Sequence, residues 1–340
     1  MTATRRPLEP SFQALIDGTF PGCEPGSEQR VVRVVIAEVR GSAPREPGAA
    51  MLVSGDAQFG TIGGGRLEFE AVRLARLMLA EQPRGDWQRR MESWPLGPNL
   101  GQCCGGHVGV LFEIFGARER DGLRSLRNGD AITRPVTSGA PLAAAQSHAR
   151  AALDGARFIE PLGPALTPVF IYGAGHTGRA IVKALEPLDF AVTWIDTAAD
   201  RFPGALSEPA SGRLTKVVTA NPARSTRLAA DTTCHVVLTY AHAMDLDICD
   251  AVLRRQKFRF LGLIGSATKR ARFVSQLRKR GIDDVALSRM TCPIGLPDLN
   301  SKHPAVLALG VAAQLQMVRE ADGDAHLGGT NTCLQALPEG

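Results

Sequence analysis

The chain has 340 residues, a formal net charge of +5 and 44% hydrophobic residues, a length that suits two domains with separate cores. The positive charge is too small and too scattered for a nucleic-acid-binding protein, because no basic run carries interleaved aromatic residues. No apolar stretch reads as a membrane span, and no apolar segment follows Arg5 and Arg6 as it would in a secretory signal. We therefore expect a cytoplasmic protein with no membrane partner, whose 7 cysteines are reduced thiols.

The first third of the chain predicts an α+β domain over residues 1–116. Segments rich in Val and Ile, or bounded by turn residues, predict strands, and a stretch of apolar residues at helical spacing predicts one helix. The strands are expected at residues 30–40, 49–54, 58–62, 88–94 and 108–115, and the helix at 67–80.

Residues 117–167 are less regular, and we interpret them as the end of the first domain and an interdomain linker. From residue 168 to residue 320 strands and helices alternate, which predicts a Rossmann-like, doubly wound parallel sheet. Strands are expected at 169–172, 190–195, 216–218, 235–239 and 260–264, and helices at 175–185, 247–255, 266–280 and 304–318. Residues 321–340 form a tail. The fold class is therefore α/β, with an α+β domain ahead of a Rossmann-like domain.

The clearest motif is Gly-Ala-Gly-His-Thr-Gly at residues 173–178, which directly follows an apolar strand and opens a helix. Gly173, Gly175 and Gly178 allow a tight turn, close approach of a phosphate and tight helix packing, and the helix start that includes His176 offers amide donors. Asp196 ends the next strand, where it can accept from a ribose hydroxyl and disfavours a 2′-phosphate. The motif predicts nucleotide or pyrophosphate binding; a turn whose glycines serve packing alone is the alternative.

A second group follows the strand at 235–239, at the sheet edge where ligands of such folds bind. His242 and Asp245 lie there, and they are the candidates for proton transfer if the chain is a dehydrogenase. His242 can act as a base or a ligand, and an exposed loop histidine is an equally good interpretation.

Two adjacent thiols, Cys103 and Cys104, lie on a glycine-rich loop ahead of His107. Neighbouring cysteines rarely bind one zinc ion, because structural zinc sites space them by two or more residues. A vicinal disulfide does not suit a reducing compartment. A thiolate that contacts a soft metal centre, or carries sulfur, fits better. Two small buried side chains beside a turn are the alternative.

Gly63, Gly64 and Gly65 precede the predicted helix at 67–80, with Arg66 beside them. Three glycines at a helix start are typical of an anion cradle, and a tight strand-to-helix turn explains them equally well.

Taken together, these motifs resemble the xanthine dehydrogenase accessory protein family (the XdhC/CoxI family). The matching segments follow the family order over nearly the whole chain: 41–45 with 48–51, 60–68, 101–106, 173–178, 262–266 with 269–273, and 292–296. Two positions depart from the family pattern. Ala43 stands where Ser or Thr is common, and Tyr240-Ala241 precedes His242 where a polar, histidine-containing stretch is common.

The resemblance implies a chaperone that binds molybdenum cofactor (molybdopterin), protects it, and inserts it into the apo subunit of a xanthine-dehydrogenase-type molybdenum hydroxylase of purine catabolism. It also implies contact with a cysteine desulfurase, so that the cofactor is sulfurated while held. The Cys103-Cys104 loop is the family position associated with cofactor binding, and Cys103 is the preferred metal contact. A nucleotide in the Rossmann crevice and a homo-oligomer are further expectations.

Two other functions remain open at this point: an NAD-dependent oxidoreductase that uses the Rossmann domain, and a nucleotide-sensing regulatory module. Both leave the Cys103-Cys104 loop unexplained. No complete set of catalytic residues is visible in the sequence, so we assign none and expect an accessory factor. The sequence does not identify the enzyme served or the plain or dinucleotide form of the cofactor.

Overall fold

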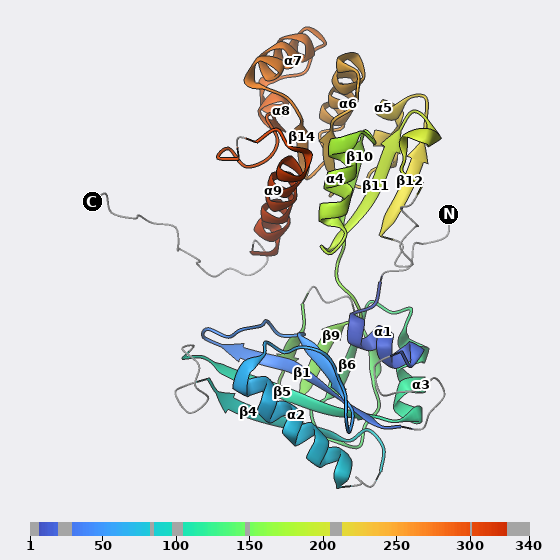
Figure 1. Cartoon of the computed structure of the whole chain (residues 1–340), viewed down its shortest axis with the longest axis vertical. Coiled ribbons are helices and arrows are strands. Elements are labelled where there is room, and N and C mark those ends of the chain that lie inside the picture. Colours follow the sequence, from blue (N-terminus) through green and yellow to red (C-terminus); the bar gives the residue numbers. More distant parts are fainter. Residues whose placement is uncertain are drawn as a thin grey trace, which may run out of the picture. The chain divides into compact units, whose positions relative to one another are not determined.

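The computed structural model describes residues 7–19, 29–81, 85–96, 105–146, 150–204, 213–299 and 301–324. The chain divides into two compact units, Met1–Ala165 and Leu166–Gly340 (Figure 1). Each unit has its own sheet system and its own core, as the length of the chain predicts. No helix in these described ranges is long and apolar enough to span a membrane.

The first unit is built on an antiparallel sheet with the order β3-β2-β1-β5-β4. Its strands are β1 (Val31–Arg40), β2 (Ala50–Val53), β3 (Gln58–Gly60), β4 (Arg89–Pro95) and β5 (His107–Phe115). Helix α2 (Gly65–Ala80) covers one face, where Val32, Val34 and Ile36 of β1 pack with Leu67 and Ala71 of the helix. Alternate side chains of β1 point to the other face, because a strand has a period of two. The strands and the helix lie where the sequence predicts them.

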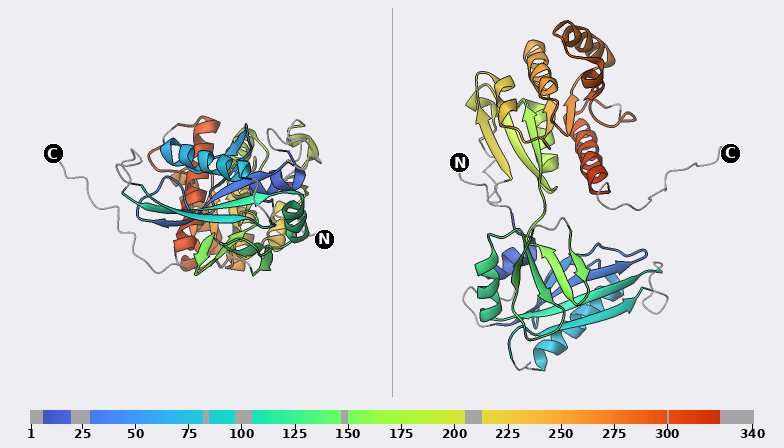
Figure 2. Two further views of the ribbon diagram at one scale, coloured as in Figure 1. Left: turned by 90° about the horizontal axis from the view of Figure 1, so that it is seen from below. Right: turned by 180° about the vertical axis from the view of Figure 1, so that it is seen from behind.

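The opposite face of β1 packs against a second sheet, with the order β7-β6-β9-β8. Its strands are β6 (Ala131–Pro135), β7 (Ala143–Ala145), β8 (Ala152–Asp154) and β9 (Arg157–Pro161). Seen from behind in Figure 2, this sheet lies in front of the first sheet, with α2 beyond. Helices α1 (Pro10–Asp17) and α3 (Ala117–Leu126) complete the unit.

The second sheet and both of these helices differ from the sequence-based expectation. Residues 117–167 were expected to hold the end of the first domain and a linker, yet most of them form α3 and four strands that belong to the first unit. All four strands have only three to five residues, and β6, β7 and β8 show no clear alternation of apolar and polar side chains. Such segments become strands through pairing and burial, which a local pattern does not reveal.

Charged side chains fill part of the space between the two sheets. Arg33 on β1 forms two hydrogen bonds with Glu160 on β9, at 2.6 and 3.0 Å. Arg134 on β6 joins Glu113 on β5 at 2.7 Å, and Arg89 on β4 reaches the same carboxylate at 3.0 Å. Burial alone would raise the pKa of Glu113, but Arg134, Arg89 and Arg33 lower it to about 2. Removing one partner would leave a buried charge unpaired and would destabilise the unit, so this network ties the two sheets together.

The second unit has a six-stranded parallel sheet with the order β12-β11-β10-β13-β14-β15. This is the doubly wound order of a dinucleotide-binding fold, with its switch point between β10 and β13. The strands are β10 (Thr167–Tyr172), β11 (Phe190–Asp196), β12 (Leu214–Val218), β13 (Cys234–Val237), β14 (Phe260–Leu263) and β15 (Met290–Thr291). The predicted Rossmann-like sheet is confirmed, and β15 is a strand that the sequence pattern did not predict.

Helices cover both faces of this sheet (Figures 1 and 2). Val169 and Ile171 of β10 pack with α4 and α9, whereas Phe170 and Tyr172 pack with α6 and α7. The helices are α4 (His176–Leu185), α5 (Pro222–Ser225), α6 (His242–Arg255), α7 (Ala267–Lys279), α8 (Asp284–Ser288) and α9 (Pro304–Asp324). Both faces are covered, and the central strands β10, β13 and β14 are accordingly buried along almost their whole length.

Candidate functional site

The loop after β10 carries the three motif glycines, and two of them are required by packing. Gly173 has a φ of +122°, and a Cβ there would lie 2.4 Å from the carbonyl oxygen of Leu238. A Cβ on Gly178 would lie 2.1 Å from the carbonyl oxygen of Gly173. Side chains at these two positions would therefore push α4 and the loop after β13 away from the loop after β10.

Gly175 is different, because a Cβ at this position would meet nothing within 4 Å. It precedes α4 directly as the N-cap residue, and His176 opens the helix with an exposed side chain. Packing does not explain the absence of a side chain at Gly175. Open space at a helix start lets the backbone approach an anionic ligand, which agrees with a phosphate-binding role for this residue.

Asp196, at the end of β11, is buried with 5% of its surface exposed. Its Oδ2 accepts from the amide of Ala174 at 2.6 Å, and its Oδ1 accepts from the amide of Thr197 at 2.6 Å. Arg201 places its Nε atom 3.4 Å from the same Oδ1. The sequence places Asp196 beside the glycine loop correctly, but in this structure its carboxylate serves to hold that loop. The ribose hydroxyl expected at Asp196 stays a prediction.

The loop after β13 is organised by a buried ion pair. Asp245 is fully buried; its Oδ1 accepts from the amide and hydroxyl of Thr239 at 2.9 and 2.7 Å. Its Oδ2 lies 2.7 Å from Nζ of Lys269, which also donates to the carbonyl of Ile264 at 3.0 Å. His242 begins α6 and is exposed. Asp245 therefore positions the loop. Its partner Lys269 was not predicted as a site residue; the sequence analysis included it only in segment 269–273, which resembles the family.

One aromatic contact also spans this edge of the sheet. Arg201, in the short 3-10 helix Ala199–Arg201, lies over the ring of Tyr240, with its guanidinium carbon 4.1 Å from the ring centroid. Neither residue was singled out as a site residue from the sequence. Tyr240 was noted only because it departs from the family pattern.

In the first unit, the amides of Ile62 and Gly64 form a small cradle at the glycine triplet, whereas the amide of Gly63 donates to the hydroxyl of Thr61. Gly63, Gly64 and Gly65 all have positive φ angles, of 124°, 74° and 66°. The amides of Ile62 and Gly64 point to the carboxylate of Glu68, at 3.0 and 3.1 Å.

The side chains of Thr61 and Gln58 donate to the same carboxylate of Glu68. Burial raises the pKa of Glu68, but these hydrogen bonds outweigh it and lower that pKa below its usual value. The anion in this cradle is thus supplied by the protein. Arg66, beside the cradle, is exposed.

Cys103 and Cys104 lie outside the described residues, in the segment 97–104. Of the described residues on either side, Leu96 donates its amide to the carbonyl of Gly106 at 2.7 Å. A Cβ on Gly106 would lie 2.1 Å from the carbonyl oxygen of Ser42.

Gly63 is packed just as closely against Pro44. A Cβ on Gly63 would lie 2.9 Å from the side chain of Pro44. The motif segments 41–45, 60–68 and 105–106 therefore meet at one end of the five-stranded sheet.

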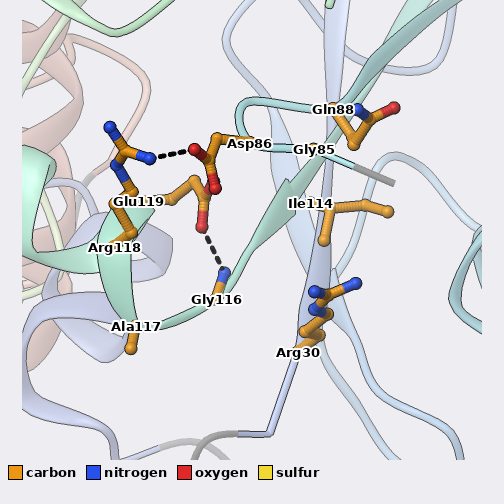
Figure 3. A pocket seen from close by; sticks show the side chains of 9 residues that line it. All are labelled: Arg30, Gly85, Asp86, Gln88, Ile114, Gly116, Ala117, Arg118 and Glu119. Atoms are coloured by element: carbon orange, nitrogen blue, oxygen red, sulfur yellow. Dashed lines mark hydrogen bonds and ion pairs between the residues drawn. The ribbon is translucent and has the colours of Figure 1, made fainter. Parts of the chain in front are cut away.

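A pocket of about 210 Å³ lies elsewhere in the first unit (Figure 3). It is bordered by the start of α3, where Glu119 accepts from the amides of Gly116 at 3.0 Å and Trp87 at 2.9 Å. Arg118 is paired with Asp86 at its rim. None of the residues predicted from the sequence lines this pocket, and its acids and bases are already paired. In the described parts of the chain, no three His, Cys, Asp or Glu side chains gather into a metal site.

Comparisons with known proteins agree with this geometry. Residues 26–90 match the model of the XdhC and CoxI family, and residues 169–315 match that of the XdhC Rossmann domain. The chain is 24% identical over 285 residues to the uncharacterized protein YqeB of Escherichia coli (strain K12), covering 84% of this chain and 42% of that protein. It thus spans less than half the length of that relative.

A crystal structure of a Bacillus halodurans protein, described as a xanthine dehydrogenase, has the same fold. It superposes with a TM-score of 0.69 at 20% identity, over 92% of this chain and 95% of the other. At this identity the likeness concerns the fold of the chain, not its activity.

Proposed function

This chain belongs to the XdhC and CoxI family, and we propose that, as an accessory protein of xanthine dehydrogenase maturation, it holds molybdenum cofactor, protects it and inserts it into the apo enzyme. The proposal extends to a cytoplasmic location, a homo-oligomer, and contact with a cysteine desulfurase that sulfurates the cofactor while it is held. The chain covers only 42% of its E. coli relative. The activities and partners named here are therefore proposals for this chain and are not taken from that relative.

The observation that carries the proposal is the meeting of three motif segments at one end of the five-stranded sheet. Gly106, which closes the Cys103-Cys104 loop, packs on Ser42, and Gly63 packs on Pro44. Leu96 and Gly106, the described residues next to the segment with the two thiols, thus lie at the same end of the sheet as the start of α2. Thiolates are preferred ligands of soft metal centres, so Cys103 or Cys104 would contact the molybdenum.

The phosphate of the cofactor needs a cationic or amide partner. Glu68 already takes the amides of Ile62 and Gly64, so this segment leaves the exposed guanidinium of Arg66 for a phosphate. Gly63, Gly64 and Gly65 then act by shaping the turn that places Arg66. The dithiolene and metal supply the redox chemistry of the target enzyme, and the residues of this chain bind and shield them.

For the second unit we propose a phosphate-bearing ligand at Gly175 and His176, between the loops after β10 and β13. An NAD-dependent oxidoreductase is the alternative function of such a fold, and one observation weighs against it. Of the two candidates for proton transfer, Asp245 is buried and paired with Lys269, so it is not arranged as a free base. That leaves the exposed His242 without an acidic partner from this pair.

Reconstitution from defined components tests the proposal. An apo molybdenum hydroxylase receives either this protein loaded with cofactor or free cofactor, at equal molybdenum. We expect faster and fuller activation by the loaded protein, and no NAD-linked turnover of 2-hydroxy acids, aldehydes or purines by the protein alone. Equal activation by free cofactor would remove the support for a carrier. NAD-linked turnover at ordinary enzymatic rates would favour the oxidoreductase.

A further inference from the structure

Arg201 and Tyr240 meet across the carboxyl end of the central strand of the parallel sheet. Arg201 follows β11 and Tyr240 follows β13, and the strand order places β10 between these two strands. A contact between the two loops must therefore pass over the carboxyl end of β10. That is where the loop with Gly173 and Gly175 leaves the sheet, so the Arg201–Tyr240 pair borders the crevice in which such folds bind their ligands.

Arg201 is tethered to the glycine loop from two directions. Its Nε lies 3.4 Å from Oδ1 of Asp196, whose Oδ2 accepts from the amide of Ala174. Its carbonyl accepts from Nη2 of Arg179 at 2.7 Å, and Arg179 also donates to the carbonyl of Ala174 at 3.1 Å. The carbonyl of Arg201 is thus held beside the loop, and its side chain, 40% exposed, lies against both Asp196 and Tyr240.

Tyr240 is an aromatic residue kept at the surface, with 63% of its area exposed. Its backbone is set by the preceding residue, since Thr239 is bound to the buried carboxylate of Asp245 through its amide and its hydroxyl. Only the guanidinium of Arg201 stacks on the ring among the aromatic and cation–π contacts of the described residues. Exposed cation–π contacts are weak, so a ligand can replace one.

We propose that Arg201 and Tyr240 are ligand-binding residues that select, for this crevice, a phosphate ester carrying a planar heteroaromatic ring. The phosphate approaches the backbone at Gly175, where space is open, and the guanidinium of Arg201 turns from the ring of Tyr240 to the phosphate. The planar ring of the ligand then stacks on Tyr240 in place of the guanidinium. This inference rests on the phosphate-binding role proposed for the second unit and is independent of the Cys103-Cys104 loop.

Calorimetric titration of the full chain with ADP, pyrophosphate and adenosine separates the two roles. Arg201→Gln should weaken ADP and pyrophosphate about tenfold and leave adenosine unchanged, because a charge-assisted contact is lost. Tyr240→Leu should weaken ADP and adenosine but not pyrophosphate, while Tyr240→Phe, which keeps the ring, should bind all three like the wild type. Arg227→Gln removes an exposed arginine that lies outside the motif segments and is the matched control for charge.

A parallel titration with dihydroneopterin triphosphate identifies the ring. If ADP binds more tightly, the ligand is a nucleotide; if the pterin phosphate binds more tightly, the ligand is a pterin. Either result supports the inference, provided that Arg201→Gln and Tyr240→Leu weaken the binding of the preferred compound. Unchanged binding in Arg201→Gln and Tyr240→Leu, with the same unfolding temperature, overturns the residue assignment. A wild type that binds none of these compounds also overturns it, yet leaves cofactor transfer in the reconstitution assay unaffected.

Discussion

The amide of Gly64 lies 3.1 Å from Oε2 of Glu68, so the first turn of α2 supplies the anion for the glycine turn that precedes it. Thr61, Gln58 and the amide of Ile62 complete the shell around the same carboxylate. Glu68 of α2 therefore occupies the position at which the sequence analysis expected an anionic ligand. This arrangement ties the end of β3 to the start of α2.

Glu68→Gln should lower the free energy of unfolding by about 0.5–1 kcal/mol at pH 7, after allowance for solvent screening at this partly exposed site. The pKa of Glu68 is lowered in the folded chain, so its contribution is present above its unfolded pKa and is lost as the pH falls through the folded value. Urea unfolding at pH 7 and at about pH 3 measures the difference. We expect the difference in free energy of unfolding between wild type and variant to shrink in acid. A difference that does not change with pH would show that the charge of Glu68 does not stabilise the fold.

Adding a side chain at Gly178 should lower the stability of the protein, whereas adding one at Gly175 should lower its affinity for a ligand. Gly178→Ala places a Cβ 2.1 Å from the carbonyl oxygen of Gly173, and we expect a loss of about 1–3 kcal/mol of stability, as in overpacked cores. Gly175→Val meets open space and should leave the unfolding temperature within a few degrees. Its effect should appear in the affinity for ADP or for the cofactor, because the side chain blocks the phosphate.

Thermal unfolding and calorimetric titration of the same two variants measure both effects. If Gly175→Val binds like the wild type, the glycine serves the turn alone.

The thiol loop is tested by Cys103→Ala, Cys104→Ala and the double variant, each expressed in a molybdate-replete host. We expect the molybdenum-to-protein ratio to fall in at least one single variant, because a soft ligand is lost. The unfolding temperature should stay near that of the wild type, since a change from Cys to Ala in a loop costs little. Retention of cofactor by all three variants at the wild-type level would show that neither thiol is a ligand.

His235 on β13 predicts a dependence of stability on pH that is unrelated to the ligand sites. Its Nδ1 lies 3.0 Å from the hydroxyl of Tyr172, and burial, aided by Arg255, lowers its pKa to about 3. Below its unfolded pKa the unfolded chain binds a proton that the folded chain does not, so stability falls as the pH falls from about 6.5 towards 3.

The slope from this residue approaches about 1.4 kcal/mol per pH unit. His235→Asn retains a polar atom near Nδ1 and should flatten the profile between about pH 6 and 5, above the range in which carboxylates titrate. Urea unfolding across this range measures the slope, and identical slopes for wild type and variant would argue against a neutral buried His235.

Local patterns predicted much of each unit. The apolar runs, the helical spacing of α2 and the glycine motif after β10 determined the parallel sheet and most of the first sheet, because each pattern is the period of the element it forms. The segments that failed were α1, α3, α5, α8, the strands β6 to β9, and β15, and most of them are short. Their residues become ordered by pairing and burial in the unit, and a window of the sequence carries no signal for that.

The sequence by itself also determined which residues carry the motifs, and family membership follows from them. Only the tertiary structure decided which contacts the described acidic residues of these motifs make. Glu68 fills the glycine cradle, Asp196 holds the loop of Ala174, and Asp245 pairs with Lys269. It also brought Arg201 to Tyr240 from loops 39 positions apart in the numbering. Hydrogen bonds and stacking act over a few ångströms. The order of residues along the chain does not give these distances, because they depend on which strands lie side by side in the folded sheet.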